Sequence, residues 1–460
     1  MPGLTLPWPK RVTEHFRVAG HFSASVFWQA LEQHTGHGAG AADRDWQQES
    51  TASAGTVDPV PRPEPASNAP SGHPLALALT GALVFLNVYA PQSLLPLLAR
   101  DLGVTPVSAG SVVGATTLAI ALVSPLSGVL ADALGRKRVI VAAFLLLILP
   151  ALLATQATTL ASLDLARFLQ GLIIPLVMVT CTAYAAEEYR GAEIGRAITA
   201  YVTGTVLGGF GGRFLSGVLV QLGGGDWRLA FWMLAGTNLL GAGLALAFLK
   251  RSRRFVPVRN LRAVAGDLRL HLHNRALLGT LLIGFVLLYT LVSAFTYAVL
   301  HLAAAPYRLG SGALGGVFAV YLLGVVVTPI SARIMARSGA PRTFAVGVAF
   351  SLLGFGLTLL ALLWLIVLGL ALASCGVFIG QAAALSAVQA SVTRARSLAS
   401  GLYSLAYYGG GAAATVLGGL AYTRAGWPGA VASSVAALLV ALVVGLWTWR
   451  EGKGLQGGGL

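Results

Sequence analysis

Charged residues are scarce in this chain: they make up 10% of its 460 residues, whereas 56% are hydrophobic and the mean hydropathy is +0.76. Soluble globular domains carry about 25% charged residues. The shortage of charge therefore excludes an ordinary soluble protein and predicts a membrane protein. Cysteine is almost absent, and both cysteines, Cys181 and Cys375, lie inside hydrophobic stretches. That excludes a disulfide framework and a cysteine-based metal site.

Acidic residues are few as well, with 16 against 31 Lys and Arg, for a net charge of +15. In a soluble protein such an excess would suggest a nucleic-acid partner. Residues 1–73 differ from the rest, because they hold seven of the acids and five of the bases among Pro, Ser, Gly and Gln. We expect this segment to be a disordered cytoplasmic tail.

Hydrophobic stretches follow one another from Pro74 to the end of the chain, each long enough to cross a hydrocarbon layer of ~30 Å as a helix. The sequence thus predicts an all-α polytopic membrane protein with twelve transmembrane helices. The expected spans are 75–98, 107–131, 139–157, 161–186, 197–222, 229–249, 277–302, 313–334, 343–361, 364–391, 398–422 and 430–449.

The basic residues divide unequally between the two ends of these spans. Of the 26 that follow residue 73, twenty fall in connections on one side, four on the other, and Arg167 and Arg213 lie within spans. The positive-inside rule then makes both termini cytoplasmic in a multi-pass protein of the plasma (inner) membrane. The bases are expected to meet anionic lipids at the cytoplasmic face of the bilayer, and no nucleic-acid partner is expected.

A long basic connection at 251–275 separates six spans from six. It divides the chain into bundles at 74–250 and 276–450, with a cytoplasmic tail at 451–460. Gly208 and Gly217 of the fifth span recur 201 residues later as Gly409 and Gly418. A Gly-x-x-Arg pair, Gly135 and Arg138, recurs 204 residues later as Gly339 and Arg342. This pattern predicts two pseudo-symmetric six-helix bundles with a ligand cavity between them.

The connection between spans two and three reads GVLADALGRKR over 128–138. It resembles the signature loop of the major facilitator superfamily. The resemblance implies a latch that holds one conformation and is released during transport, formed by Gly128, Asp132, Gly135, Arg136 and Arg138. Alanine replaces three equivalent positions of the second half, so any latch there is expected to be weaker or absent (Ala332, Ala336, Ala340).

Span four contains RFLQG at 167–171, which resembles the family's Arg-x-x-Gln-Gly motif. In proton-linked members this motif has been assigned to proton transfer or to organising the cavity. Asp164 lies three residues before Arg167 on the same helix face, so the two can pair. An arginine inside a membrane is costly and by default functional. The alternative is that Arg167 extends to the membrane surface.

Span five is rich in glycine, and Gly204, Gly208 and Gly212 allow a neighbouring helix to approach closely. The stretch resembles the antiporter motif of the drug/sugar:proton efflux branch. Arg213 stands where the drug branch usually has proline, which puts hydrophobic-drug specificity in doubt. A cation at this position can bind an anionic solute or pair with Asp164.

No Walker A sequence is present, so the expected mechanism is secondary transport. Asp164 is the only acid inside a span apart from those at span boundaries, and we expect proton coupling at Asp164 with Arg167 or Arg213. Polar and aromatic side chains at mid-depth are expected to line the substrate cavity: Asn87, Gln92, Gln170, Asn238, Tyr289, Tyr297, Gln381, Tyr403 and Tyr407. We expect no cofactor, no metal and no enzymatic site.

The resemblance as a whole implies a monomeric secondary active transporter. Its expected activity is proton-coupled export of small organic molecules, drug or sugar-like, by rocking of the two halves. Two alternatives stay open. One is an uptake carrier or exchanger for a small anionic solute, and the other is a non-transporting membrane scaffold or sensor.

Overall fold

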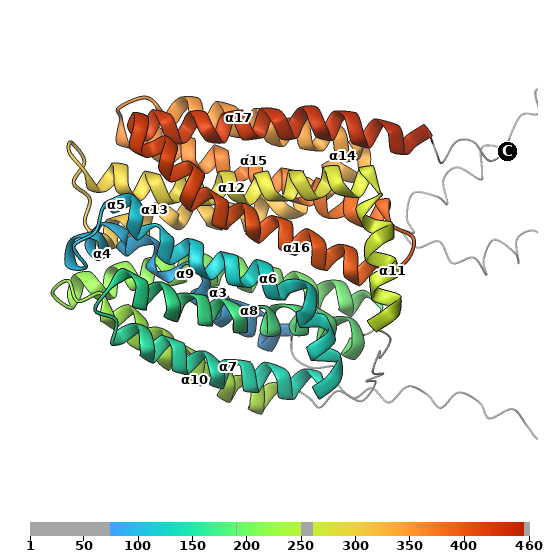
Figure 1. The fold of residues 1–460 in the computed structure, drawn as a ribbon, viewed down its shortest axis with the longest axis horizontal. Coiled ribbons are helices and arrows are strands. Elements are labelled where there is room, and N and C mark those ends of the chain that lie inside the picture. The colour runs from blue at the N-terminus through green and yellow to red at the C-terminus, as the bar shows by residue number, and fades with distance from the viewer. Residues whose placement is uncertain (1–73, 190, 250–260, 455–460) are drawn as a thin grey trace, which may run out of the picture. The chain divides into compact units, whose positions relative to one another are not determined.

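The computed structural model describes residues 74–189, 191–249 and 261–454, which belong to a compact unit spanning Pro70–Leu460. These residues form helices and no strand (Figure 1). The expected tail at 1–73, part of the connection at 251–275 and residues 455–460 lie outside the described residues. Side chains of 128–134 also lie outside them.

The first half of the described chain begins with a broken helix. That helix consists of α3 (Pro74–Tyr89), the 3₁₀ segment η2 (Ala90–Leu94) and α4 (Leu95–Asp101). The first half continues with α5 (Pro106–Ala109), α6 (Ser111–Leu134), α7 (Arg136–Thr155), α8 (Leu160–Glu188), α9 (Ala192–Leu222) and α10 (Arg228–Phe248). Gly135 has φ of 85°, a conformation that glycine adopts without strain, and this allows α6 to turn directly into α7.

The second half begins with a short helix, α11 (Leu261–Leu272), in the segment for which the sequence predicted only a loop. It continues with α12 (Arg275–Ala303), α13 (Ser311–Val317), η3 (Phe318–Leu322), α14 (Leu323–Thr358), α15 (Leu363–Ser391), α16 (Arg396–Ala413), the π turn η4 (Ala414–Gly418) and α17 (Gly419–Gly454). Asn274 caps α12, because its Oδ1 accepts from the backbone N–H of Leu277 at 3.1 Å.

Among the described residues, ten helical stretches are long and hydrophobic enough to span a membrane. Two of them, Ser311–Thr358 and Arg396–Trp449, contain 48 and 54 residues. A crossing helix needs about 20 residues, so each is long enough to cross twice. Non-helical backbone interrupts both, at Gly339 in one and at Ala425 and Gly426 in the other. The expected count of twelve is obtained when each long stretch is divided at its break.

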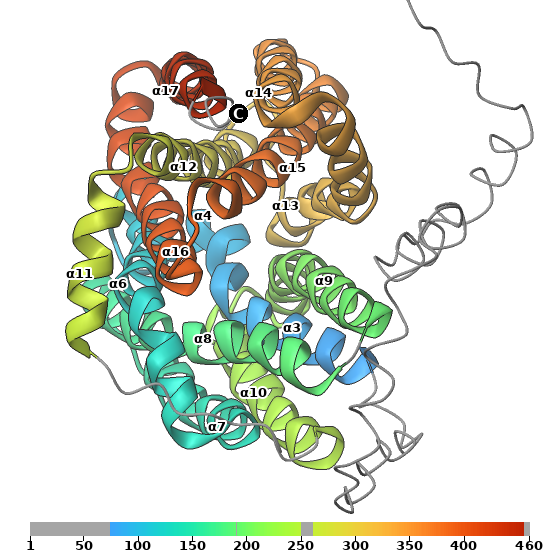
Figure 2. The same cartoon turned by 90° about the vertical axis from the view of Figure 1, so that its right-hand side faces the viewer.

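The helices pack mainly within their own half. In the first half α3 packs on α9, α6 on α8 and α7 on α10, and in the second α12 packs on α16 and α17, and α14 on α15. Figure 2 shows the two groups, with α6 and α9 of the first half against α16 and α13 of the second. These two helix pairs are the main junctions between the halves.

The outer surface of this bundle is hydrophobic. On α6, for example, Leu118, Leu122 and Leu126 recur every four residues and are 44%, 52% and 61% exposed. A soluble protein does not leave such a stripe in water, whereas a lipid bilayer solvates it.

The two ends of the bundle are distinct. We call the α11 face the end where α11 crosses the other helices and α17 terminates, and the opposite face the end that carries α4 and α5 (Figure 1).

Candidate functional site

Arg167 of α8 is fully buried and bonds to the break in the first span. Its Nη1 donates to the carbonyl of Asn87 at 2.8 Å and its Nη2 to that of Val88 at 2.7 Å. These carbonyls need an external donor because Pro91 has no N–H to offer, either in the α-helical pattern to Asn87 or in the 3₁₀ pattern to Val88. Arg167 therefore completes the hydrogen bonding of a broken helix, and it does not extend to the membrane surface.

The rest of the RFLQG motif supports this arginine. Gln170, one turn later on α8, accepts from Arg167 Nη1 through Oε1, while its own Nε2 is buried without a partner. At Gly171 a Cβ would overlap the backbone of Thr116 on α6. The glycine thus lets α6 and α8 approach closely, and the glutamine orients the guanidinium.

Asp164 lies half-buried one turn before Arg167. Its Oδ2 accepts from the hydroxyl of Ser111 at 2.7 Å, and its Oδ1 is buried with no hydrogen-bond partner. Among the ion pairs of the described residues, none joins Asp164 to Arg167 or to Arg213. The expected pairing with either arginine is therefore not formed here, because Ser111 holds the carboxylate and backbone carbonyls hold Arg167.

Arg213 of α9 sits in a cage of aromatic rings and is 1% exposed. Its guanidinium carbon lies 4.3 Å from the ring centre of Tyr89, 4.6 Å from that of Phe318 and 4.5 Å from that of Tyr321. Tyr89 ends α3 of the first half, whereas the other two rings belong to η3 of the second. Cation–π attraction therefore joins the two halves at this point.

Hydrogen bonds extend the cage on both sides. Arg213 Nε donates to Gln92 Oε1 at 2.8 Å, and Gln92 Nε2 donates to the Thr296 hydroxyl of α12 at 2.9 Å. Arg213 Nη1 donates to the carbonyl of Gly209 at 2.6 Å. The fully buried amide of Gln92 thus links the cation of the first half to a hydroxyl of the second.

Two further contacts join α9 to the second half nearer the opposite face. The hydroxyl of Ser311 donates to the carbonyl of Gly217 at 3.0 Å, and the N–H of Gly312 donates to Gln221 Oε1 at 2.9 Å. With the cage, they form a seam along residues 213–221 of α9, where the helix approaches the opposite face.

The glycines of α9 face the first span. A Cβ at Gly204 or Gly208 would overlap the backbone of Ala78 or Ala82, and one at Gly212 would crowd Leu86. The three glycines therefore allow backbone-to-backbone packing of α9 on α3.

Three other cavity candidates form hydrogen bonds within their own half. Asn87 and Asn238 exchange amide hydrogen bonds of 2.9 and 3.0 Å between α3 and α10, inside the first half. Tyr297 donates from α12 to the carbonyl of Thr415 at 2.9 Å, in the π turn. Tyr289 is buried on the same helix.

Three further cavity candidates lie together in the second half: Gln381 of α15 and Tyr403 and Tyr407 of α16. Tyr403 donates to Gln381 Oε1 at 2.9 Å and stacks on Tyr407 with ring centres 6.0 Å apart.

The segment that resembles the signature loop is described in part. The surroundings of Gly128 and the side chain of Asp132 lie outside the described residues, and Arg138 is exposed. Arg136 donates to Glu187 at the end of α8, with Nη2 2.6 Å from Oε1. Lys137 donates to the carbonyl of Leu246 in the last turn of α10 at 2.7 Å, where a cation also favours the helix dipole.

The sequence of this chain matches a known protein family. Residues 77–414, well over half of the chain, match the family model described as Major Facilitator Superfamily. The chain belongs to the Major Facilitator Superfamily. Membership accounts for the helical fold, the multi-pass arrangement and secondary transport as the general activity.

Known transporters align with most of this chain. It is 31% identical over 372 residues to the Inner membrane transport protein YnfM of Escherichia coli (strain K12), covering 81% of this chain and 89% of the relative. It is 28% identical over 368 residues to the Uncharacterized MFS-type transporter YybF of Bacillus subtilis (strain 168), covering 80% and 91%. A bacterial homolog to the human lysosomal transporter Spinster, in an inward-facing and occupied conformation, shares the fold with a TM-score of 0.67 and 13% identity, covering 82% and 96%.

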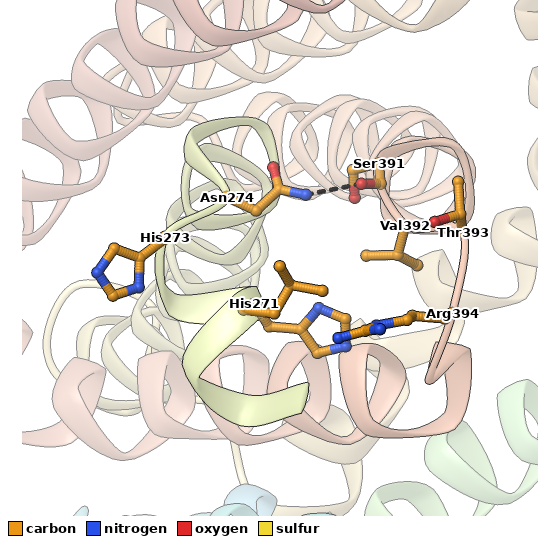
Figure 3. A pocket seen from close by; sticks show the side chains of 8 residues that line it. His271, His273, Asn274, Ser391, Val392, Thr393 and Arg394 are labelled. Atoms are coloured by element: carbon orange, nitrogen blue, oxygen red, sulfur yellow. Dashed lines mark hydrogen bonds between the residues drawn. The ribbon is translucent and has the colours of Figure 1, made fainter. Parts of the chain in front are cut away.

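A cavity of about 320 Å³ opens at the α11 face of this transporter, between the α11–α12 connection and the α15–α16 connection. Figure 3 shows Asn274 donating to the carbonyl of Ser391, at 2.7 Å, while His273 points away from the other labelled side chains. Arg394 forms an ion pair with Asp267 of α11 at 3.2 Å. The ion pair tethers α11 to the α15–α16 connection.

Sequence reasoning missed three partners of the cage, Phe318, Tyr321 and Thr296. The first two are aromatic and three residues apart, a spacing that would have placed them on one face of the eighth span. Nothing in the sequence indicated that this face meets Arg213. Within the described residues, no group of three or more His, Cys, Asp or Glu side chains is placed to hold a metal ion.

Proposed function

We propose that this transporter exports small organic molecules, drug or sugar-like, in exchange for protons. The observation that carries the proposal is the carboxyl of Asp164, which lies in a span with Oδ1 buried and unpartnered. A charged carboxylate with an unsatisfied buried oxygen is costly, and proton binding removes that cost. A carboxyl in such a place is suited to bind and release a proton as its surroundings change.

A route from the moving halves to this carboxyl exists in the packing. The hydroxyl that holds Asp164 belongs to Ser111, the first residue of α6. Because α6 packs on α16 of the second half, a displacement of α16 reaches the hydrogen-bond partner of Asp164 through α6. Coupling would then mean that Ser111 moves away from Asp164 in one conformation.

The conformational cycle we propose is rocking of residues 74–250 against 276–450. The seam along α9 holds the halves together near the opposite face in the present conformation, and it would separate in the other. The Gly128–Arg138 segment would act as the latch at the α11 face. Arg136, paired with Glu187, would anchor that latch to α8.

We assign the α11 face to the cytoplasm because it holds the basic connections, so both termini would be cytoplasmic. The name of the Escherichia coli relative supports the inner membrane as the location. Anionic lipids would then contact the basic α11 face, and the working unit would be a monomer. One proton crossing 100 mV supplies ~2.3 kcal/mol, enough to expel a neutral solute roughly fiftyfold against its gradient.

The test uses the purified full chain in liposomes that enclose a pH-sensitive dye. A proton gradient is imposed and pools of drugs, sugars and organic acids are screened for solute-dependent proton movement. Asp164→Asn should abolish that movement. Asp226→Asn, which alters an acid whose side chain is 50% exposed near the start of α10, should preserve it. Undiminished proton movement in Asp164→Asn would refute the assignment.

A second candidate function is uptake or exchange of a small anionic solute. It is favoured by Arg213, a buried cation that forms no ion pair with any carboxylate of the described residues. Solute exchange that proceeds without proton movement, and that survives Asp164→Asn but not Arg213→Gln, would establish this function in place of the first.

A further inference from the structure

The guanidinium of Arg213 is surrounded by groups that belong to both moving halves. Tyr89, Gln92 and the Gly209 carbonyl belong to the first half, with Arg213 itself. Phe318 and Tyr321 belong to the second. This inference rests on the proposed alternating access, in which these two sets of groups separate.

Separation at the opposite face would change the surroundings of Arg213 in a defined way. The cation keeps the ring of Tyr89 and its bonds to Gln92 and Gly209, because these partners move with it. It loses the rings of Phe318 and Tyr321, and Gln92 loses the hydroxyl of Thr296. The guanidinium of Arg213 is thereby exposed. It keeps the ring of Tyr89 beside it, and the places of the Phe318 and Tyr321 rings become empty.

The vacated space fits one ligand chemistry. A guanidinium carries five N–H donors in a planar fork. Within the first half Arg213 uses two of them, on Gln92 and Gly209, so three are left once the halves separate. A carboxylate or sulfonate accepts such donors in a bidentate pair. A planar aromatic ring attached to that group can lie where Phe318 and Tyr321 lay, beside Tyr89.

We propose that Arg213 selects the transported solute and that the solute is a small aromatic anion, an arenecarboxylate or arenesulfonate. The anion and the aromatic residues of η3 occupy the same surroundings of one cation and therefore exclude each other. When the halves close again, Phe318 and Tyr321 displace the anion. Closure at the opposite face and loss of the anion from Arg213 are thus a single step.

The proposal is tested by equilibrium binding to the purified full chain, with four small probes. Benzoate and benzenesulfonate carry both features, benzamide lacks the charge, and cyclohexanecarboxylate lacks the planar ring. Isothermal titration should give affinities for the first two that are about tenfold or more above those of the last two. Equal affinities for benzoate and benzamide would overturn the proposal.

Variants then locate the site. Arg213→Gln should remove the preference for benzoate over benzamide, whereas Arg100→Gln, at a position whose side chain is 74% exposed near the opposite face, should preserve it. Tyr321→Leu removes one ring of the closed cage and leaves Arg213 itself unchanged, so it should raise the affinity for benzoate severalfold. Unchanged preference in Arg213→Gln, or weaker binding in Tyr321→Leu, would contradict the assignment.

A cross-link keeps Arg213 itself intact and so guards against misfolded variants. Gln221→Cys with Gly312→Cys places two thiols where the native side chain and backbone form a 2.9 Å hydrogen bond across the seam. Both native cysteines are buried and should not compete. Cross-linking should suppress benzoate binding about tenfold or more, and reduction should restore it. Full binding in the cross-linked protein would overturn the proposal.

Failure of this proposal and failure of proton-coupled export have different signatures. Asp164→Asn should lose proton movement yet keep the preference for benzoate. If proton coupling is absent while Arg213 still selects benzoate, only the proposed export mechanism falls. If proton movement depends on Asp164 but benzoate and benzamide bind alike, only the solute class falls.

Discussion

Replacing Arg167 tests whether this arginine holds the first span together. Arg167→Met removes the donors that serve the carbonyls of Asn87 and Val88 at 2.8 and 2.7 Å. Each buried carbonyl left without a donor costs about 1–3 kcal/mol, so the expected loss for two is about 2–6 kcal/mol. That is a large share of a typical unfolding free energy of about 5–15 kcal/mol. Arg167→Lys, with fewer donors and no planar fork, should lose roughly half as much.

The assay follows unfolding with a thiol-reactive fluorescent dye, because Cys181 and Cys375 are buried and react only when the chain opens. Arg100→Met, at an exposed position, should change the stability by less than about 0.5 kcal/mol. A similarly small change in Arg167→Met, with transport lost, would refute the structural role and favour proton transfer at Arg167.

A double-mutant cycle sharpens this test. Pro91→Ala restores the N–H whose absence leaves the carbonyls of Asn87 and Val88 without a backbone donor. Arg167→Met should therefore cost at least about 1 kcal/mol less in the Pro91→Ala background than alone. Equal costs in the two backgrounds would show that Arg167 does not serve the break at Pro91.

Three further changes test other contacts by the same unfolding assay. Gly208→Val should destabilise the protein strongly, by about 2 kcal/mol or more, because its Cβ would overlap the backbone of α3. Gly243→Val, with open space at its Cβ, is the control. Equal effects of the two changes would contradict close packing of α9 on α3. Arg136→Gln and Glu187→Gln should show a coupling of about 1–3 kcal/mol in a double-mutant cycle, since their side chains are only 8% and 27% exposed; a coupling near zero would remove Glu187 as the anchor of the latch. Asn238→Leu should cost about 1–3 kcal/mol by stranding its buried amide partner on α3, and replacing both amides with leucine should recover part of that loss; no recovery would mean that the pair does not act as a unit.

The spans were predictable because hydrophobic length alone determines which segments cross a membrane. The turn at Gly135 was also predictable, since glycine readily adopts its positive φ. The sequence did not reveal the breaks at Ala90–Leu94 and Phe318–Leu322 inside spans one and eight. Proline at residue 91 was visible, but its consequence depends on a donor from another helix.

The partners of the buried charges could not be predicted from spacing. Asp164 and Arg167 are three residues apart, which permits pairing on a helix. In the fold, Asp164 instead accepts a hydrogen bond from Ser111 of α6, and Arg167 donates to carbonyls of α3. These partners are far from α8 in the sequence and close to it only in the fold. The cage of Arg213 is a stronger case, because two of its rings come from a segment about 105 residues further along the chain.

Solute-dependent proton entry into liposomes, recorded for the native chain and for Asp164→Asn, decides whether this transporter couples export to protons. Benzoate is the named solute, loaded on the side of the α11 face, at zero and at 100 mV of membrane potential. Exchange of one anion for one proton moves two charges, so the potential adds ~4.6 kcal/mol of driving force. Proton entry should require benzoate, rise with the potential and disappear in Asp164→Asn. Benzoate flux with no proton entry, or proton entry unchanged in the variant, would contradict it.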